Sequence, residues 1–384
     1  MSEYQYYEFL AVDRPLTSEE MAGLRRISTR ASITPVSFTN EYNYGDLKAD
    51  PVELLKYCFD AHVYVANWGT AVFMVRLPID VLPAKTAGAV SAPGVLDFEA
   101  TETHWIITWR LDESKDYDRF GMEDGGGWMA RLAPIRDELL RGDVRGLYIG
   151  WLAAVSMEML EDDDPEPLAV EGLGSLTAAQ QALAEFLEVD VDLLAGAGMG
   201  RSEEKDEAES EKEIDDWLEG LGRDEVAGIL KLLLAGQGQQ AERTLKNRFF
   251  EWRRGLRGER TDAPLRTVGE LWNNAKASEK IRLEREKIER ERLEARRRAE
   301  RLAYLETLAK DFPKAWESIE ANVERGSGLG YNEACRALVD LSDAYQAHAS
   351  RKAFQGELKK FMAGHMRRKA LIERLVKAGL WNEK

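Results

Sequence analysis

Hydrophobic residues follow two different periods along the chain, and the change of period falls near residue 128. Before it, apolar and polar residues alternate, which is typical of half-buried strands. The strongest case is a hairpin of residues 62–67 and 71–77 around Gly69. Residues 4–12 and 33–38 are predicted to form two further strands.

A second hairpin is predicted over residues 95–110, with its turn near residues 101–103. Trp105, Ile107 and Trp109 share one face of this hairpin, because neighbouring members of the set are two residues apart. We expect this face to be buried.

Local signals place two short helices between the strands. Thr17 is followed by Glu19 and Glu20, so a helix that begins here has acids in its first turn. Asp50 and Pro51 mark a second helix start, because Asp caps a helix and Pro suits its first turn.

After residue 128 the apolar residues follow the period of a helix. Residues 217–234 and 241–252 are expected to form an antiparallel helix pair, with Ile229, Leu232 and Leu233 on its buried face. The other helices are predicted over residues 129–140, 144–160, 176–187, 191–194, 266–311, 314–323, 331–349 and 352–379.

These patterns predict an α+β N-terminal domain, with an antiparallel or mixed sheet and helices, followed by an all-α C-terminal half that contains a long charged helix. The expected divisions are an α+β sheet domain (1–127), a helical extension packed on it (128–195), an acidic linker (196–216), a helical hairpin (217–265), the long charged helix (266–311) and a C-terminal helical bundle (312–384).

The long charged helix carries half of a coiled-coil pattern. Ile281, Ile288, Ala295 and Leu302 recur every seven residues, but Glu284 and Glu291 occupy the second apolar position of their heptads. Pairs of acids and bases at i,i+4 support an exposed helix. The helix is therefore either a solvent-spanning helix or one side of a weak coiled coil.

Charge divides the chain into two unlike parts. The net charge is −16; residues 1–216 hold 18 basic and 43 acidic residues, whereas residues 217–384 hold 35 and 26. The two halves therefore present opposite fields, which attract each other or partners of opposite sign. The sequence has no apolar run long enough for a membrane helix, and its polar start does not resemble a secretory signal.

Two cysteines, Cys58 and Cys335, lie far apart within apolar patterns. We expect them to be buried free thiols, which indicates a reducing compartment and a cytoplasmic protein. No membrane partner is expected, and the oligomeric state stays open.

Candidate chemistry is sparse. The sequence holds no phosphate-binding loop ending in Gly-Lys-Ser/Thr, no HExxH, no paired CxxC and no GxSxG. Two cysteines and four scattered histidines do not predict a metal site, and no cofactor is expected. His62 or His104 could serve as a general base beside Asp60 or Glu102, although the favoured interpretation is a strand histidine near the surface.

Basic residues cluster at two places, which makes them candidate contacts for a protein partner or for DNA or RNA. In the first, aromatic residues 249, 250 and 252 are interleaved, so they either stack on bases or form core beneath a solvated face. The candidates are Arg243, Lys246, Arg248, Arg253, Arg254, Arg257 and Arg260 in the first cluster, and Lys359, Lys360, Arg367, Arg368 and Lys369 in the second.

The stretch YYEFLAVDRPLTSEEMAGLRRISTRASITPVSFTNEYNYGD, followed by YVANWGTAVFMVRLP, resembles the opening of a bacterial family of uncharacterised proteins. The similarity continues through the linker and the charged helix. No activity is assigned to that family, so the resemblance implies a recurring architecture and no catalytic residues.

Three hypotheses of function follow. The first is a non-enzymatic adaptor or regulatory scaffold, because a long helix and helical hairpins suit partner docking. The second is a nucleic-acid-associated accessory protein that binds through its basic helical half. The third is an enzyme with its site in the β domain, around Tyr42, Tyr44, Asp46, His62 and Trp68.

Overall fold

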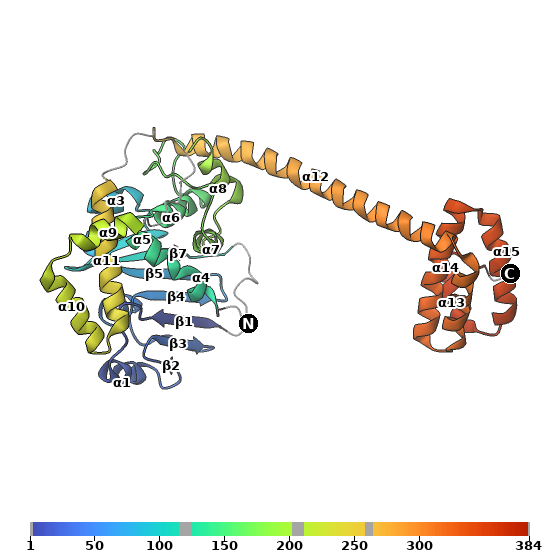
Figure 1. Ribbon diagram of the computed structural model, residues 1–384, viewed down its shortest axis with the longest axis horizontal. Coiled ribbons are helices and arrows are strands. Elements are labelled where there is room, and N and C mark those ends of the chain that lie inside the picture. Colours follow the sequence, from blue (N-terminus) through green and yellow to red (C-terminus); the bar gives the residue numbers. More distant parts are fainter. Residues whose placement is uncertain (1–2, 115–124, 202–210, 258–263, 383–384) are drawn as a thin grey trace. The chain divides into compact units, whose positions relative to one another are not determined.

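The computed structural model describes residues 3–114, 125–201, 211–257 and 264–382 (Figure 1). These residues form two compact units. Unit 1 extends to Ile281 and unit 2 begins at Arg282. Of the expected linker 196–216, residues 196–198 belong to a helix and residues 211–216 to the next one, whereas residues 202–210 lie outside the described residues.

Unit 1 is built on an antiparallel sheet with the strand order β2-β3-β1-β4-β5-β7-β6. This confirms the α+β class. The strands are β1 (Gln5–Leu10), β2 (Ser32–Ile33), β3 (Ser37–Tyr42), β4 (Ala61–Ala66), β5 (Ala71–Pro78), β6 (Leu96–Ala100) and β7 (His104–Leu111).

Both predicted hairpins are confirmed, as β4–β5 and β6–β7. The strand predicted over residues 33–38 is wrong in extent, because the chain turns there: β2 ends at Ile33 and β3 begins at Ser37. Pro35 lies between them and has no N–H to donate to a strand ladder. The turn closes with a hydrogen bond from Thr34 N–H to the Ser37 carbonyl, at 2.9 Å.

One face of the sheet carries the main core of unit 1. Trp105, Ile107 and Trp109 all lie in it, as predicted, and the Trp109 indole N–H donates to the Gly146 carbonyl at 3.0 Å. Buried side chains of several helices join this core, among them α3 (Ala84–Val90), α4 (Trp128–Leu132), α5 (Pro134–Leu140), α6 (Arg145–Ser156), α7 (Ala178–Phe186) and α8 (Val191–Gly198).

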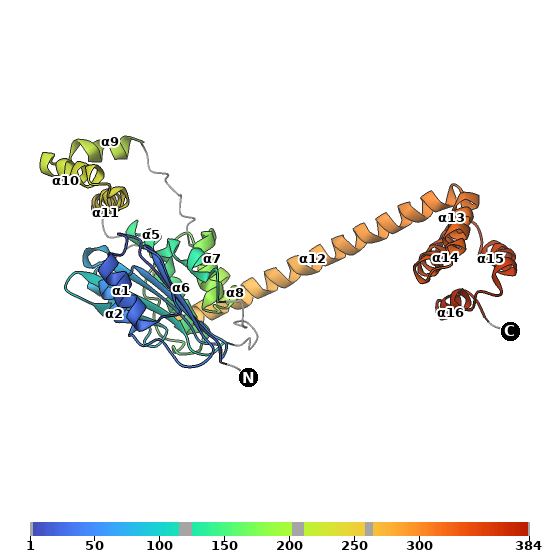
Figure 2. The same ribbon diagram turned by 90° about the horizontal axis from the view of Figure 1, so that it is seen from below.

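The opposite face is covered by α1 (Ser18–Ile27) and α2 (Pro51–Tyr57), so the sheet lies between two helical layers (Figure 2). Both local helix signals are confirmed. Thr17 and Glu20 form a reciprocal capping box, and the Asp50 carboxylate accepts from Val52 N–H at 2.8 Å.

The helix predicted over residues 129–140 is two helices, α4 and α5, which meet at Ala133 and Pro134. Proline has no N–H for an intrahelical bond, so it ends one helix and begins the next. A 3-10 turn at Ile79–Val81 and helix α3 were not predicted.

The helices after α8 are α9 (Glu211–Glu219), α10 (Arg223–Leu234) and α11 (Gly238–Arg257). The single helix predicted over residues 217–234 is interrupted at Gly220-Leu221-Gly222, where the two glycines favour a turn over a helix. The predicted buried face is also wrong: Ile229 and Leu232 are half-buried and Leu233 is 50% exposed. The reason is that α10 packs beside α11, with no further layer over its other side in the described residues.

The long charged helix is α12 (Val268–Ala309), which has 42 residues. Ile281, Ile288 and Leu302 are 46%, 55% and 59% exposed. An i,i+4 ion pair predicted from the sequence, Arg282–Glu286, is present at 3.0 Å.

Unit 2 is completed by α13 (Phe312–Glu324), α14 (Gly328–His348), α15 (Arg351–His365) and α16 (Lys369–Lys377), which share a core of their own. The helix predicted over residues 352–379 breaks at residues 366–368. Arg368 has a non-helical backbone there, and its guanidinium donates to the Val323 carbonyl at 2.6 Å. This break lets Leu371 and Leu375 of α16 enter the core.

Cys58 and Cys335 are free thiols, as predicted, but each is half-buried rather than buried. Among the described residues, no helix has the length and apolar character needed to cross a membrane.

Candidate functional site

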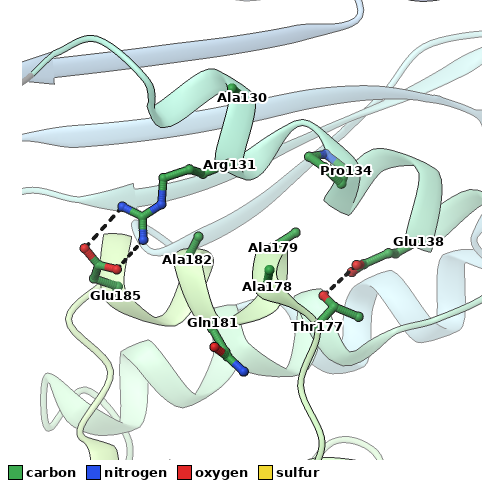
Figure 3. Close-up of a pocket in the computed structure, with 10 residues that line it drawn as sticks. All are labelled: Ala130, Arg131, Pro134, Glu138, Thr177, Ala178, Ala179, Gln181, Ala182 and Glu185. Carbon is green, nitrogen blue, oxygen red and sulfur yellow. Dashed lines mark hydrogen bonds and ion pairs between the residues drawn. The ribbon is translucent and has the colours of Figure 1, made fainter.

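A hollow of about 540 Å³ lies between α4, α5 and α7 in unit 1 (Figure 3). Its floor is made of small residues, among them Ala130, Ala178 and Ala182. At one end, Arg131 forms an ion pair with Glu185. At the other end, the Thr177 hydroxyl donates to Glu138 at 2.6 Å. The charged groups around the hollow therefore bind one another.

Glu138 is the titratable group of this hollow whose pKa departs from its ordinary value. Burial raises the pKa of the Glu138 carboxyl, and hydrogen bonds from Thr177 and Gln180 oppose that rise. The Gln180 amide also donates to Asp143, at 2.7 Å. The Glu138 side chain is thus held by hydrogen bonds from two residues, Thr177 and Gln180, which tie the start of α7 to α5, and this is a structural role.

The residues of the proposed β-domain enzyme site are brought together only in part. The Tyr7 hydroxyl donates to the Asp46 carboxylate at 2.5 Å, and the rings of Tyr7 and Tyr42 meet edge to face at 5.7 Å. Tyr44 and Trp68 are 82% and 46% exposed and take no part in this contact. The hollow between α4, α5 and α7 is lined by other residues.

His62 is fully buried in β4, and its ring stacks on Phe9 with centroids 3.9 Å apart. Burial lowers the pKa of His62 to about 3, partly opposed by its hydrogen bond with the Glu8 carbonyl. Asp60, the acid proposed beside it, binds Arg76 instead, at 2.6 Å. These contacts give His62 a packing role, and the predicted position near the surface is wrong for this residue.

His104 is half-buried, and its Nδ1 lies 2.7 Å from the Thr103 hydroxyl. Burial lowers the pKa of His104, and the positive charge of Arg76 lowers it further. Within the described residues, no group of three His, Cys, Asp or Glu side chains is placed to hold a metal ion.

A buried ionic cluster lies at the edge of the core, between the sheet and α5. Arg76 binds Asp60 at 2.6 Å and Arg136 binds Asp13 at 2.7 Å, with Arg136 and Asp60 each 1% exposed. Burial raises the pKa of Asp13. Burial also acts upward on Asp60, but Arg136 and Arg76 outweigh it and its pKa is lowered.

Sequence reasoning missed this cluster as a unit. The available signal was a charged residue, Arg76, within the apolar run of β5. Charged residues are almost never fully buried unless they are paired, so such a position predicts an unseen partner. It does not say where in the chain that partner lies.

A second buried acid, Glu166, holds the start of α12. Its carboxylate accepts from Arg266 at 2.7 Å, from Arg201 at 2.5 Å and from the Tyr148 hydroxyl at 2.5 Å. Burial acts to raise the pKa of Glu166, but these hydrogen bonds outweigh it and the pKa is lowered. Glu166 is 0% exposed, so the pairing is structural.

The first basic cluster rests on aromatic residues that belong to the core. Phe249 and Phe250 are 6% and 5% exposed, and Phe249 meets Trp217 at 5.3 Å. The guanidinium carbon of Arg141 lies over the Phe250 ring, 5.3 Å from its centroid. Of the two alternatives, stacking on bases is therefore wrong for these two rings, because they are already packed.

The cations of this first cluster have acidic neighbours where their side chains are described. Arg248 lies 3.3 Å from Glu225, Lys246 lies 2.5 Å from Glu242, and the buried Arg253 lies 3.3 Å from Glu213. The side chains of Arg243, Arg254 and Arg257, and all of Arg260, lie outside the described residues.

The second basic cluster lies on α15, α16 and the turn between them. Lys359, Lys360, Arg367 and Lys369 are exposed. Arg368 differs from them, because its half-buried guanidinium donates to the Val323 carbonyl and to the Tyr331 hydroxyl. Arg368 is therefore part of the fold, and the other four are surface cations.

An exposed apolar face lies on α10, which has no buried residue. Leu230, Leu233 and Leu234 are 52%, 50% and 89% exposed, and Val226 on the same side is 39% exposed. This face departs from the apolar-inside pattern, because the apolar periodicity of α10 predicted burial.

Comparison of the chain with protein-family models, with curated proteins and with solved structures found no match. The resemblance to a bacterial family therefore stays a prediction.

Proposed function

We propose that this chain is a non-enzymatic adaptor, and that the apolar face of α10 binds an amphipathic helix of a partner protein. The exposure of Leu230, Leu233 and Leu234 on one short helix is the observation that carries the proposal. Contiguous exposed apolar patches are characteristic of interaction sites in folded proteins.

The spacing of this face favours a helix as its occupant. Val226, Leu230, Leu233 and Leu234 stand at i, i+4, i+7 and i+8, so they form one ridge along α10. Ridges of this kind pack into the grooves of a second helix, and binding of an amphipathic helix is a common mode of partner recognition.

The exposed charges of α9 and α10 favour a partner helix with basic residues beside its apolar face. On α9 and α10 the exposed acids outnumber the exposed bases, although both are present. Complementary charges around an apolar centre steer association and fix its register. The exposed acids are Asp215, Asp216, Glu219, Asp224 and Glu225, and the exposed bases are Lys212, Arg223 and Lys231.

The test uses the full-length chain and a synthetic 18-residue peptide with leucines on one helical face and lysines beside them. Its control is a peptide of the same composition whose leucines are spread around the helix. Fluorescence anisotropy should give a micromolar Kd for the amphipathic peptide. The double variant L230E/L233E should weaken binding at least about tenfold, since each change puts a charge into an apolar contact.

The matched variant is L283E/L293E, because Leu283 and Leu293 on α12 are exposed to a similar extent (50% and 46%). It should leave the Kd of the peptide unchanged. Equal binding of both peptides, or of both variants, contradicts the proposal. A dimer of the chain that dissociates in L230E/L233E also contradicts it, since the occupant is then a second copy.

We further propose that the adaptor works in the cytoplasm. The free thiols of Cys58 and Cys335 support this, because reducing compartments keep cysteines unpaired.

A further inference from the structure

Charge is distributed unevenly within unit 2. The segment 312–348, which holds α13 and α14, has three basic and six acidic residues, whereas the segment 351–377, which holds α15 and α16, has nine basic and two. Two acids of α14 are occupied by the end of α12: Arg301 binds Asp340 at 2.6 Å and Asp343 at 2.7 Å. Glu320 of α13 lies 2.8 Å from the buried His365 of α15, and among the described residues no ion pair joins an acid of α13 or α14 to an exposed cation of α15 or α16.

The cations of α15 and α16 are mostly unpaired. Six exposed cations lie between residues 351 and 369. Within the described residues, Lys360 forms an ion pair with Glu357 at 2.7 Å, and no ion pair is found for the other five. We call this set the cationic surface. Its members are Arg351, Lys352, Lys359, Lys360, Arg367 and Lys369.

The spacing of these cations follows the exposed side of α15. Lys352 and Lys359 are seven residues apart, which is two helical turns or about 10.5 Å along the axis. Arg367 follows eight residues later, just past the end of the helix. Lys352 and Lys359 therefore lie on the same side of α15, and Arg367 continues the exposed positive charge beyond the end of the helix.

Between these cations the exposed side of α15 carries residues with small side chains or none. Gly356 and Gly364 are exposed, and a Cβ at either position would meet nothing within 4 Å. Ala363 is exposed as well. A polymer backbone can therefore approach α15 closely without displacing side chains.

The aromatic residues of the two helices face inward. Phe354 is 3% exposed, and Phe361 packs against the same core. Single-stranded nucleic acids are held largely by bases stacked on exposed aromatic rings, and this surface offers none of those among its described residues. Cations without a stacking surface fit the outside of a duplex, where the phosphates are presented and the bases are paired.

From this arrangement we infer that the cationic surface binds the phosphate backbone of double-stranded nucleic acid without reading its sequence. Arg351, Lys352, Lys359, Lys360, Arg367 and Lys369 contact phosphates directly. This goes beyond the adaptor proposal, since it does not depend on α10. It also restricts the expected nucleic-acid contact, for which both basic clusters were candidates, to the second cluster.

The experiment measures binding of the full-length chain to a fluorescent 30-base-pair DNA duplex between 50 and 200 mM salt. The slope of log K against log salt should approach about −5, from about −0.9 for each of six phosphate contacts. The variant K359E/R367E/K369E should bind at least about tenfold more weakly at 50 mM salt. Its slope should be shallower by about 2.7, for three lost contacts.

A matched variant, K280E/K287E/R297E, makes the same change of net charge at exposed positions of α12. It should keep the affinity within about threefold and the slope unchanged. A neutral variant, K359Q/R367Q/K369Q, should also bind the duplex more weakly than the unmodified chain, but with a smaller loss of affinity than K359E/R367E/K369E. Circular dichroism of each variant checks that the helices are retained.

Four results overturn the inference. The first is no binding of the unmodified chain to the duplex at 50 mM salt, and the second is equal loss in the α12 variant. The third is displacement of the duplex by polyglutamate at equal total charge, which indicates an acidic protein as the partner. The fourth is binding to phosphatidylserine vesicles, but not to the duplex, that K359E/R367E/K369E abolishes.

Discussion

His62 is the clearest case of a single residue whose burial has a measurable consequence. Its ring is stacked on Phe9 and stays neutral, because burial lowers its pKa to about 3. The ordinary value for histidine is about 6.5, so between pH 3 and 6.5 the unfolded chain binds a proton that the folded chain does not. Unit 1 therefore loses stability as the pH falls through this range.

The size of the loss follows from the shift. One pKa unit corresponds to about 1.4 kcal/mol, so the free energy of unfolding should fall by roughly 2 kcal/mol between pH 6.5 and 5. Urea unfolding of the full-length chain, followed in unit 1, measures this. His62→Gln should flatten most of the dependence, whereas His104→Gln, at a half-buried ring, should keep most of it. An unchanged slope in His62→Gln contradicts the assignment.

Which polar residues could be predicted depends on how far apart the partners lie in the chain. Thr17 with Glu20, and Asp50 with Val52, act over two or three residues, so the sequence predicts both caps. Arg136 and Asp13 are 123 residues apart, and no local pattern joins them. His62 was predicted to be a strand histidine near the surface, which is wrong, because its burial depends on the strands and helices that pack around β4.

At the scale of helices and strands, periodicity predicted the type of most elements and misjudged where some of them end. Apolar residues keep their helical spacing across Pro134 and across Gly220 to Gly222, yet the chain breaks at both places. Backbone chemistry decides such breaks, because proline lacks a donor and glycine favours turns. The exposed face of α10 is a different failure: periodicity shows that a face is apolar, but not that the same chain covers it.

The start of α12 gives a prediction at this scale. Glu166→Gln removes the charge that Arg201 and Arg266 share, and leaves two poorly exposed guanidinium groups without a carboxylate. Breaking a buried ion pair on one side costs roughly 3–5 kcal/mol. Hydrogen exchange should therefore accelerate at the amides of Val268 and Leu271, in the first turn of the helix.

The control for this change is Glu270→Gln. Glu270 is exposed and accepts from Thr267 N–H at 2.8 Å, in the capping box at the start of the same helix. An amide at this position still accepts that bond, so the cost should be below about 1 kcal/mol. If the two variants have equal effects on exchange, Glu166 does not anchor α12.

At the scale of the whole molecule, the sequence predicted an α+β fold followed by helices because strand periods precede helical ones. It placed the long helix between two helical segments, but the division into two compact units falls inside that helix, between Ile281 and Arg282. A helix shows no break in its own periodicity where its packing partners change. Only the contacts of its two ends, with Glu166 in unit 1 and with Asp340 in unit 2, assign each part.

The separate cores of the two units lead to the last prediction. Leu338 is fully buried in the core of unit 2, and Leu152 is fully buried in the core of unit 1. Leu338→Ala should destabilise unit 2 by roughly 2–5 kcal/mol through the lost contacts and the cavity it leaves. Native-state hydrogen exchange should then show faster exchange in α14 and no change in β5, since the two elements belong to different cooperative units. Leu152→Ala should have the opposite effect, and faster exchange of both elements in either variant would show that the chain unfolds as one unit.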